Sequence, residues 1–431
     1  MARRFRKHIF MVLLVAAIVV PLSSVTLAAP VTITMLVNHG IEDAPLFVEV
    51  AEMFMETHPN IKVEVQNVPS GGSDYYQKLT VMGASNTLSD IFYMRGGSGD
   101  TRFYRMGFAK DLTPLVERDA AEVDIDDLID AQIQELQYPQ GVWRALPYDY
   151  STVGLYYNKE LFDEAGVGYP ADDWTWDDLI AAARKLTKTR GNRVLQYGLA
   201  QTPAFAAVTQ WMEGMILTEG GVMFTEDYSK CIIDDPETVK IFEKWADIAL
   251  EYRAAPLPGE TAQENVYFTG RAAMTFDGSW GTMGHRNMSG FPFDVAMLPQ
   301  GPDGKRVCGA TGGSWAISKD TKHLEEAWEF VKYLASPEAQ RVLIVDPVRS
   351  LPARKSLLDD WAAQITKTGL DPQNARIFAT EAELYGKNTP VLPIDYMFVI
   401  ENKLPQIAKE PVDTVLKSVA DEINRLLDEA K

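Results

Sequence analysis

The sequence predicts an α/β fold that is divided into two domains. From Val31 onward, the spacing of apolar residues switches repeatedly between two residues, as in strands, and about 3.6 residues, as in helices. Short connections between these segments favour β-α-β units, which build a largely parallel sheet with helices on both faces. The chain has 431 residues, more than one hydrophobic core usually serves, so two domains are expected.

The first elements after the leader alternate between strand and helix. Residues 32–37 form an apolar run typical of a buried strand, and residues 47–54 place apolar side chains at helical spacing. Alternation over 61–65 predicts the next strand. A helix over 75–82 and a strand over 90–94 complete the pattern.

Helix starts are marked further along the chain. Thr175 precedes an acidic first turn, which suits the positive end of a helix dipole. Asp235 is a helix cap, and Pro236 follows it at the first helical position. Two more amphipathic helices are predicted over 322–335 and 412–430.

Residues 1–29 are predicted to be a signal peptide. A basic segment is followed by an apolar segment over 9–20 and by small residues before a cleavage site at Ala28 or Ala29. Pro21 ends the apolar run before it reaches the roughly 20 residues of a membrane-spanning helix. Because no cysteine is near the cleavage site, we expect a free periplasmic protein rather than a lipid-anchored one.

Composition excludes several classes of partner and site. The net charge is -19, and no dense cluster of Lys and Arg follows residue 7, so a nucleic-acid partner is not expected. The five histidines are scattered, so neither a metal site nor a cofactor is expected. Cys231 and Cys308 are expected to be unpaired thiols.

Five segments, taken in order, resemble the extracellular solute-binding proteins of sugar ABC transporters, the family that includes maltose-binding protein. They are LPYDYS over 146–151, LYYNKELF over 155–162, WTWDDL over 174–179, FTGRAAMTFDGSW over 268–280 and GGSWAIS over 312–318. Each segment alone is a modest signal. Their order and spacing over nearly the whole mature chain make the resemblance specific.

The resemblance implies a two-lobed periplasmic binding protein fold of type II, in which hinge strands join two α/β lobes. Residues 30–149 and 311–352 would form lobe 1, and residues 150–310 and 353–431 would form lobe 2. The strands expected to cross between the lobes lie at 152–157, 307–310 and 351–355. The resemblance also implies a monomer that binds a sugar or polyol between the lobes and delivers it to ABC permease subunits in the inner membrane.

Trp280 is the first candidate for ligand binding. A sugar offers C–H surfaces that pack on aromatic rings and hydroxyls that need hydrogen-bond partners. Gly278 and Ser279 predict a turn directly after the strand at 273–276, so Trp280 would project from the carboxyl end of that strand. Ligands of open α/β sheets bind at this end. The alternative is a tryptophan that packs in the core.

Tyr93 and Arg95 are further candidates because they lead from a strand into a glycine-rich loop at 96–99. Asp100 and Arg102 follow the loop. Loops at strand ends often carry function. The glycine spacing fits neither a dinucleotide-binding fingerprint nor a P-loop.

Five candidates lie at a strand end or beside the first crossing strand. Asn38 and His39 end the first predicted strand, where a simple turn is the alternative explanation. Tyr148, Asp149 and Tyr150 precede the crossing strand, where packing of the hinge is the alternative.

The remaining candidates come from the resemblance. They are Gln201, Trp211, Gly313, Trp315 and Tyr396. Paired glycines at this place let a ligand approach the backbone closely, but they could equally relieve crowding where the second crossing strand enters its lobe.

Three functional classes remain open: a transport receptor, a secreted carbohydrate-active enzyme, and a sensor or adhesion module. The enzyme would need two carboxylates that face each other across a cleft, and Asp100, Asp149 and Asp277 could supply them. No Gly-x-Ser-x-Gly elbow is present, and the function is expected to be binding without catalysis.

The class of ligand also remains open beside sugars and polyols. A phosphate ester would call for convergent arginines, for which Arg95 and Arg102, with His39, are the candidates. A polyamine would call for carboxylates around an aromatic side chain such as Trp280.

Overall fold

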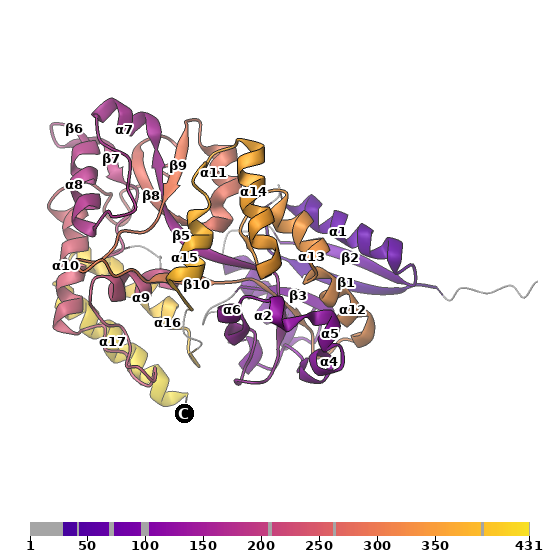
Figure 1. Ribbon diagram of the computed structural model, residues 1–431. Helices are drawn as coiled ribbons and strands as arrows, with labels where there is room; N and C mark the ends of the chain where they lie inside the picture. The colour runs from indigo at the N-terminus through magenta and orange to yellow at the C-terminus, as the bar shows by residue number, and fades with distance from the viewer. Residues whose placement is uncertain are drawn as a thin grey trace, which may run out of the picture.

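Two sheets, each accompanied by helices, form the two halves of the molecule (Figure 1). The computed structural model describes residues 29–40, 43–68, 73–95, 103–205, 209–261, 264–388 and 392–430. The predicted signal peptide before Ala29 and the predicted loop with Asp100 and Arg102 lie outside the described residues. The type II two-lobed α/β class predicted from the sequence is confirmed by the fold.

The first sheet has the strand order β2-β1-β3-β11-β4. Its strands are β1 (Val31–Val37), β2 (Ile61–Asn67), β3 (Ile91–Met94), β4 (Ala145–Pro147) and β11 (Ser314–Ile317). Strand β1 runs parallel to β2 and β3, whereas β11 runs antiparallel to β3 and β4. The late strand β11 therefore lies in a sheet whose other strands come from residues 31–147.

Helices of two distant chain segments share the core of this half. They are α1 (Ala44–Thr57), α2 (Ser73–Ala84), α4 (Thr113–Arg118), α5 (Ala120–Val123), α6 (Asp130–Glu135), α12 (Leu324–Leu334) and α13 (Pro337–Gln340). Helix α1 buries Phe47, Val50, Ala51 and Phe54, the face predicted from their spacing. The core cluster contains residues from 33 to 148 and from 315 to 344.

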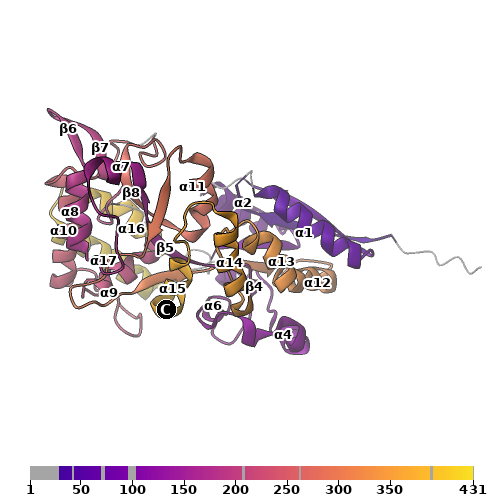
Figure 2. The same ribbon diagram turned by 45° about the horizontal axis from the view of Figure 1, so that its top comes forward.

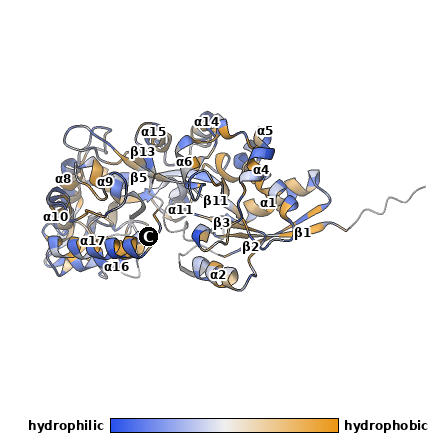
Figure 3. Ribbon diagram, turned by 90° about the horizontal axis from the view of Figure 1, so that it is seen from below, coloured by the Kyte–Doolittle hydropathy of each residue, from blue (hydrophilic) through white to orange (hydrophobic). Residues whose placement is uncertain are grey.

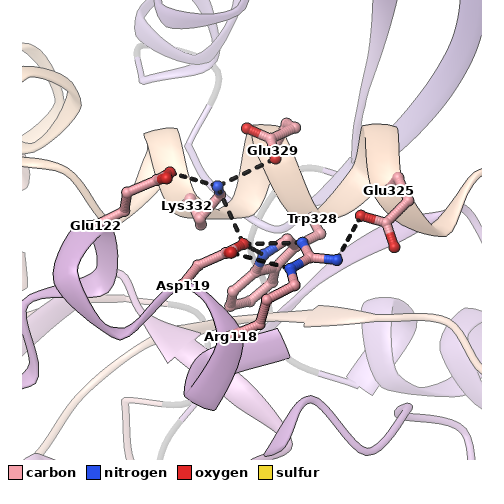
Figure 4. A network of polar contacts seen from close by, with 7 residues as sticks. All are labelled: Arg118, Asp119, Glu122, Glu325, Trp328, Glu329 and Lys332. Carbon is pink, nitrogen blue, oxygen red and sulfur yellow. Dashed lines mark hydrogen bonds and ion pairs between the residues drawn. The ribbon is translucent and has the colours of Figure 1, made fainter. Parts of the chain in front are cut away.

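A polar network fastens α12 to α4 and α5 (Figure 4). The Lys332 ammonium lies 3.3 Å from the Asp119 carboxylate and 2.5 Å from the Glu122 carboxylate. The Trp328 indole N–H donates to Asp119 at 2.6 Å. Strand β11 and helices α12 and α13 thus return to the first half, whereas β12 (Leu351–Pro352) pairs with a strand of the other sheet. The predicted division of the chain into lobes remains a prediction.

The second sheet has the strand order β13-β10-β5-β8-β7-β6. Its strands are β5 (Asp149–Asn158), β6 (Lys188–Arg190), β7 (Arg193–Leu199), β8 (Ala272–Gly278), β10 (Cys308–Thr311) and β13 (Gly386–Asn388), and β9 (Phe293–Ala296) and β12 (Leu351–Pro352) also pair with β5. The prediction of largely parallel sheets is wrong here, because β5 comes across from the first half and runs antiparallel to β8, β9, β10 and β12. Parallel pairing joins β7 to β8 and β10 to β13.

The remaining helices are α7 (Lys159–Ala165), α8 (Trp176–Leu186), α9 (Thr209–Thr218), α10 (Pro236–Leu250), α11 (Thr282–Met288), α14 (Leu358–Thr368), α15 (Ile377–Leu384), α16 (Tyr396–Lys403) and α17 (Val412–Glu429). Of these, α8, α10 and α17 begin where the sequence predicts. A capping box between Thr175 and Asp178 begins α8, and the Asp235 carboxylate accepts from the Glu237 N–H at the start of α10. Hydrophilic and hydrophobic residues alternate along α17 in Figure 3, as expected for an amphipathic helix.

Short helical segments complete the fold. They are 3₁₀ turns over Ile125–Asp127, Ser279–Gly281, Lys355–Leu357 and Leu404–Ala408, and a π-helix over Arg341–Val345. Helix α14 packs against this π-helix and β12, and it stands between the two halves in Figures 1 and 2.

Both cysteines are buried and unpaired, as predicted. Burial raises the pKa of the Cys231 thiol to about 12, and burial also raises the pKa of the Cys308 thiol well above its ordinary value. Among the described residues, no helix combines the length and the apolar character needed to span a bilayer.

Candidate functional site

A cavity of about 300 Å³ lies where the two halves meet. Its wall from the first half contains Asn38, His39, Gly40, Asp43, Tyr76, Tyr93 and Arg95. Its wall from the second half contains Trp280, Gly281, Met283 and Gly284. Residues beside the predicted crossing strands add Asp149, Ser151, Thr311, Gly312, Gly313 and Arg349. A molecule in this cavity would therefore contact both halves and the segments that join them.

Strand ends deliver the side chains of both walls. Asn38 and His39 follow β1, and Arg95 follows β3, in which Tyr93 lies. Trp280 lies in the 3₁₀ turn that follows β8 and precedes α11. The cavity thus forms at the carboxyl ends of these strands, where open α/β sheets bind ligands.

Trp280 is half-buried and packs on a second tryptophan. Its ring stacks on Trp211 of α9 with centroids 5.1 Å apart and an interplanar angle of 27°. Trp211 itself is buried and does not line the cavity. Trp280 therefore lines the cavity and also packs against the second core. The position expected for a ligand-binding tryptophan and the packing expected for a core tryptophan thus occur together in this residue.

Arg349 organises the polar side of the cavity, and it is not among the residues predicted from the sequence. The buried guanidinium lies 2.8 Å from His39 Nδ1 and 3.2 Å from the Asp43 carboxylate, and it also contacts the Tyr148 hydroxyl. Arg349 lies just ahead of the third crossing segment, and no motif marks it. The one available signal was its position two residues before the predicted crossing over 351–355.

Asp149 ties the crossing segments together at the cavity. Its carboxylate accepts hydrogen bonds from the Gly313 N–H at 2.7 Å and from the Ser350 hydroxyl at 2.6 Å. Burial raises the pKa of Asp149 above its ordinary value. Asp149 thus lines the cavity and also connects the segments beside it. Its position fits both interpretations from the sequence, contact with a ligand and packing of the hinge.

Gly313 allows this close packing because it has no side chain. A Cβ at this position would lie 2.7 Å from a Tyr93 ring carbon and 2.8 Å from Asp149 Oδ1. The glycine therefore relieves crowding, and it also lines the cavity.

The structure brings seven of the predicted site residues to the cavity wall. They are Asn38, His39, Tyr93, Arg95, Asp149, Trp280 and Gly313. Whether they bind a ligand remains a prediction. Asp100 lies outside the described residues.

Five other candidates do not line the cavity. They are Tyr148, Tyr150, Trp211, Trp315 and Tyr396, and all five are buried. Trp315 packs edge-on against Tyr93 and Tyr148 in the first core, and Tyr396 packs edge-on against Phe224 in the second core. Large aromatic side chains at strand and helix ends fill the cores beneath the walls, so a sequence pattern alone does not distinguish them from wall residues.

The carboxylate pair of the enzyme alternative is not formed by Asp149 and Asp277. Asp277 does not line the cavity, because its carboxylate lies 2.9 Å from His285 Nε2 and accepts the Gly278 N–H. Gln201 is also turned away, since its amide donates to the Phe276 carbonyl at 3.1 Å. In the described residues, no group of His, Cys, Asp and Glu is arranged to hold a metal ion.

Comparisons with known proteins give a consistent result. The sequence model of the family described as bacterial extracellular solute-binding protein matches residues 40–341. The chain is 26% identical over 343 residues to the erythritol/L-threitol-binding protein of Mycolicibacterium smegmatis, a match that covers 73% of this chain and 68% of that protein. It is 25% identical over 327 residues to the arabinooligosaccharide-binding protein of Bacillus subtilis, with 70% of each chain covered.

Solved structures show the same fold. An ABC substrate-binding protein from Listeria monocytogenes in complex with cycloalternan has a TM-score of 0.80 and 24% identity, and the match covers 93% of this chain and 99% of that one. A solute-binding protein from Agrobacterium radiobacter in complex with ribitol has a TM-score of 0.72 and 24% identity, and the match covers 92% of this chain and 99% of that one.

Proposed function

Because the chain belongs to the family of bacterial extracellular solute-binding proteins, we propose that it binds a sugar or polyol in the cavity between its two halves. It then delivers this solute to the permease subunits of an ABC importer. The binding is reversible and involves no chemical step.

The observation that carries this proposal is the composition of the cavity wall. The wall contains Trp280 from the second half, His39 and Tyr93 from the first half, and Asp149 from a crossing strand. A ligand that touches both halves stabilises the closed arrangement over the open one. A permease that contacts both halves can then distinguish the loaded form from the empty form.

The chemistry of the wall favours a sugar or polyol. Trp280 offers an aromatic surface for C–H groups, and Asn38, His39, Asp149 and Arg349 offer hydrogen-bond partners for hydroxyls. Some relatives are named for ligands of this class, among them an erythritol/L-threitol-binding protein and an arabinooligosaccharide-binding protein. A bound polyamine is less favoured, because Asp277 does not line the cavity and the Asp43 carboxylate on the wall is already paired with Arg349.

We place the working protein in the periplasm as a monomer. Its basic and apolar leader over residues 1–29 supports export and cleavage, and the absence of a cysteine near the cleavage site supports a free protein. Its partners are then the solute and the permease subunits in the inner membrane.

A thermal-shift screen of the mature chain tests the proposal. The panel contains mono-, di- and trisaccharides, erythritol, ribitol, glycerol phosphate esters and polyamines. A ligand that binds the native state raises the melting temperature, so a sugar or polyol is expected to do so in proportion to the logarithm of its concentration once binding is saturated. A response to polyamines or phosphate esters alone would contradict the proposed class of ligand. Hydrolysis of a sugar at catalytic turnover would contradict binding without chemistry.

A further inference from the structure

A buried arginine and a buried histidine meet at the cavity wall. Arg349 Nη2 lies 2.8 Å from His39 Nδ1, and the two residues are 7% and 3% exposed. A guanidinium has only donors, so the imidazole Nδ1 must be the acceptor in this contact. An imidazole that accepts at Nδ1 carries its proton on Nε2 and is neutral.

The surroundings of His39 favour the same neutral form. The ring stacks on Phe47 with centroids 4.5 Å apart, and the Tyr93 and Tyr148 rings lie at 4.9 and 5.3 Å. The Asp43 carboxylate lies 3.2 Å from the Arg349 guanidinium. Burial, and then the positive charge of Arg349, hold the pKa of His39 well below its ordinary value.

Donor and acceptor atoms at this wall lack partners within the protein. His39 Nε2, Arg349 Nε and Asn38 Oδ1 are buried and have no hydrogen-bond partner among the described residues. All three residues line the cavity. The two nitrogen atoms are donors and the oxygen atom is an acceptor. Buried polar atoms without a hydrogen-bond partner lower the stability of the folded protein, so a bound molecule that pairs with them is favoured.

We infer that Arg349 fixes His39 as a neutral hydrogen-bond donor, through Nε2–H, for a hydroxyl group of the ligand. A hydroxyl suits this wall because it can accept from His39 or Arg349 and donate to Asn38. A carboxylate can only accept, and an ammonium group can only donate. Arg349 is then a positioning residue and His39 a residue that selects ligands. The part concerning the ligand rests on the function proposed above.

The state of His39 can be measured without any ligand. Spectra of the imidazole nitrogens of the ¹⁵N-labelled mature protein distinguish a protonated nitrogen from an unprotonated one, and His39→Gln assigns the signals of His39. We expect a proton on Nε2 and none on Nδ1, without change between about pH 8 and about pH 5. A proton on Nδ1, or titration near the ordinary histidine pKa of about 6.5, would overturn the inference.

Two variants separate positioning from simple packing. Arg349→Met removes the charge and the donor, so His39 is expected to titrate at a higher pH than in the wild type. Arg349→Lys keeps a charge and a donor, so the Nε2–H form is expected to persist. Titration of His39 that is the same in Arg349→Met and in the wild type would contradict the assigned role. If Arg349→Met does not fold, as judged by circular dichroism, the wild-type and Arg349→Lys spectra still decide the state of His39.

Erythritol, ribitol and maltose, added in turn, test the contact with the ligand. A compound that raises the melting temperature is expected to shift the His39 Nε2–H resonance. Binding that leaves this resonance in place would contradict the role of His39. If none of the three raises the melting temperature, the proposed function is weakened, whereas the ligand-free spectra still decide the state of His39.

Discussion

The position of Trp280 depends on its immediate neighbours. A Cβ at Gly278 would lie 2.1 Å from the Trp280 ring, so only a glycine lets the ring fold back over the end of β8. The ring also stacks on Trp211, which belongs to the second core. Trp280 is thus held in one orientation before any ligand arrives, which reduces the entropy lost on binding.

Replacing Trp280 should therefore weaken binding without unfolding the protein. Trp280→Ala removes the aromatic surface, and we expect a loss of about 2 kcal/mol or more in binding free energy, as for other aromatic hot spots. Isothermal titration calorimetry with the compound found by the screen measures this loss. Trp280→Phe, which keeps a smaller aromatic face, should lose less. Unchanged affinity in Trp280→Ala would mean that the ligand binds elsewhere.

Gly313→Ala tests the close packing at the crossing segment. The added Cβ would lie 2.7 Å from the Tyr93 ring and 2.8 Å from Asp149 Oδ1. We expect a loss of about 1–3 kcal/mol in the free energy of unfolding, as for overpacking in other cores. Urea denaturation measures it. Gly168→Ala is the matched control, because its Cβ would meet no atom within 4 Å. Equal effects in the two variants would contradict the packing argument.

The sequence predicted wall residues best where they directly follow a strand. Trp280, Asn38 and His39 are of this kind, because strand ends are visible as changes of period. Arg349 could not be predicted, since 310 positions separate it from His39 and only the fold brings them together. Trp315 was also a candidate, but it is buried and does not line the cavity. A buried aromatic and a wall aromatic have the same local pattern, and a role of Trp315 in binding remains a prediction.

Helix α6 hydrogen-bonds to the backbone of two segments that connect the halves. The Gln132 amide donates to the Asp149 carbonyl at 2.6 Å and to the Gly313 carbonyl at 3.1 Å. One turn later, the Glu135 carboxyl group accepts from the Gly312 N–H at 3.1 Å. One short helix thus fixes the entry to β5 and the link between β10 and β11. The period of the sequence located the first strands and several helices, but it predicted neither α6 nor these contacts, which depend on the tertiary fold.

Glu135 should make stability depend on pH. Burial raises its pKa from the ordinary 4.5 to about 8, so the folded protein holds a proton that the unfolded chain releases above about pH 4.5. The contribution of Glu135 to stability is therefore full below pH 4.5 and is lost as pH rises to about 8. Buried Glu381, with its pKa raised to about 7, acts in the same direction.

Glu135→Gln should remove this part of the pH dependence. Glutamine keeps an acceptor for the Gly312 N–H but does not ionise. As the pH rises from 6 to 9, the variant is expected to gain on the order of a few kcal/mol in free energy of unfolding relative to the wild type. Its melting temperature should therefore rise relative to that of the wild type over the same range. Differential scanning calorimetry across this range measures it, with the exposed Glu117→Gln as control. A difference that stays constant with pH would contradict the assignment.

At the scale of the whole molecule, two halves with separate cores are joined by three crossing segments. One core contains residues from 33 to 148 and from 315 to 344, and another contains residues from 153 to 308 and from 392 to 427. The cavity lies between these cores and beside the crossing segments. Small changes in the backbone of the crossing segments can therefore move one half as a body against the other, and a ligand that touches both halves favours closure.

Small-angle X-ray scattering tests this central claim most directly. The radius of gyration of the mature protein is measured with and without a saturating amount of the compound found by the screen. We predict a smaller radius of gyration with the ligand, and no change for Trp280→Ala at a concentration that this variant does not bind. Saturated binding in the wild type, verified by calorimetry, without any decrease of the radius of gyration would contradict a mechanism of delivery by closure.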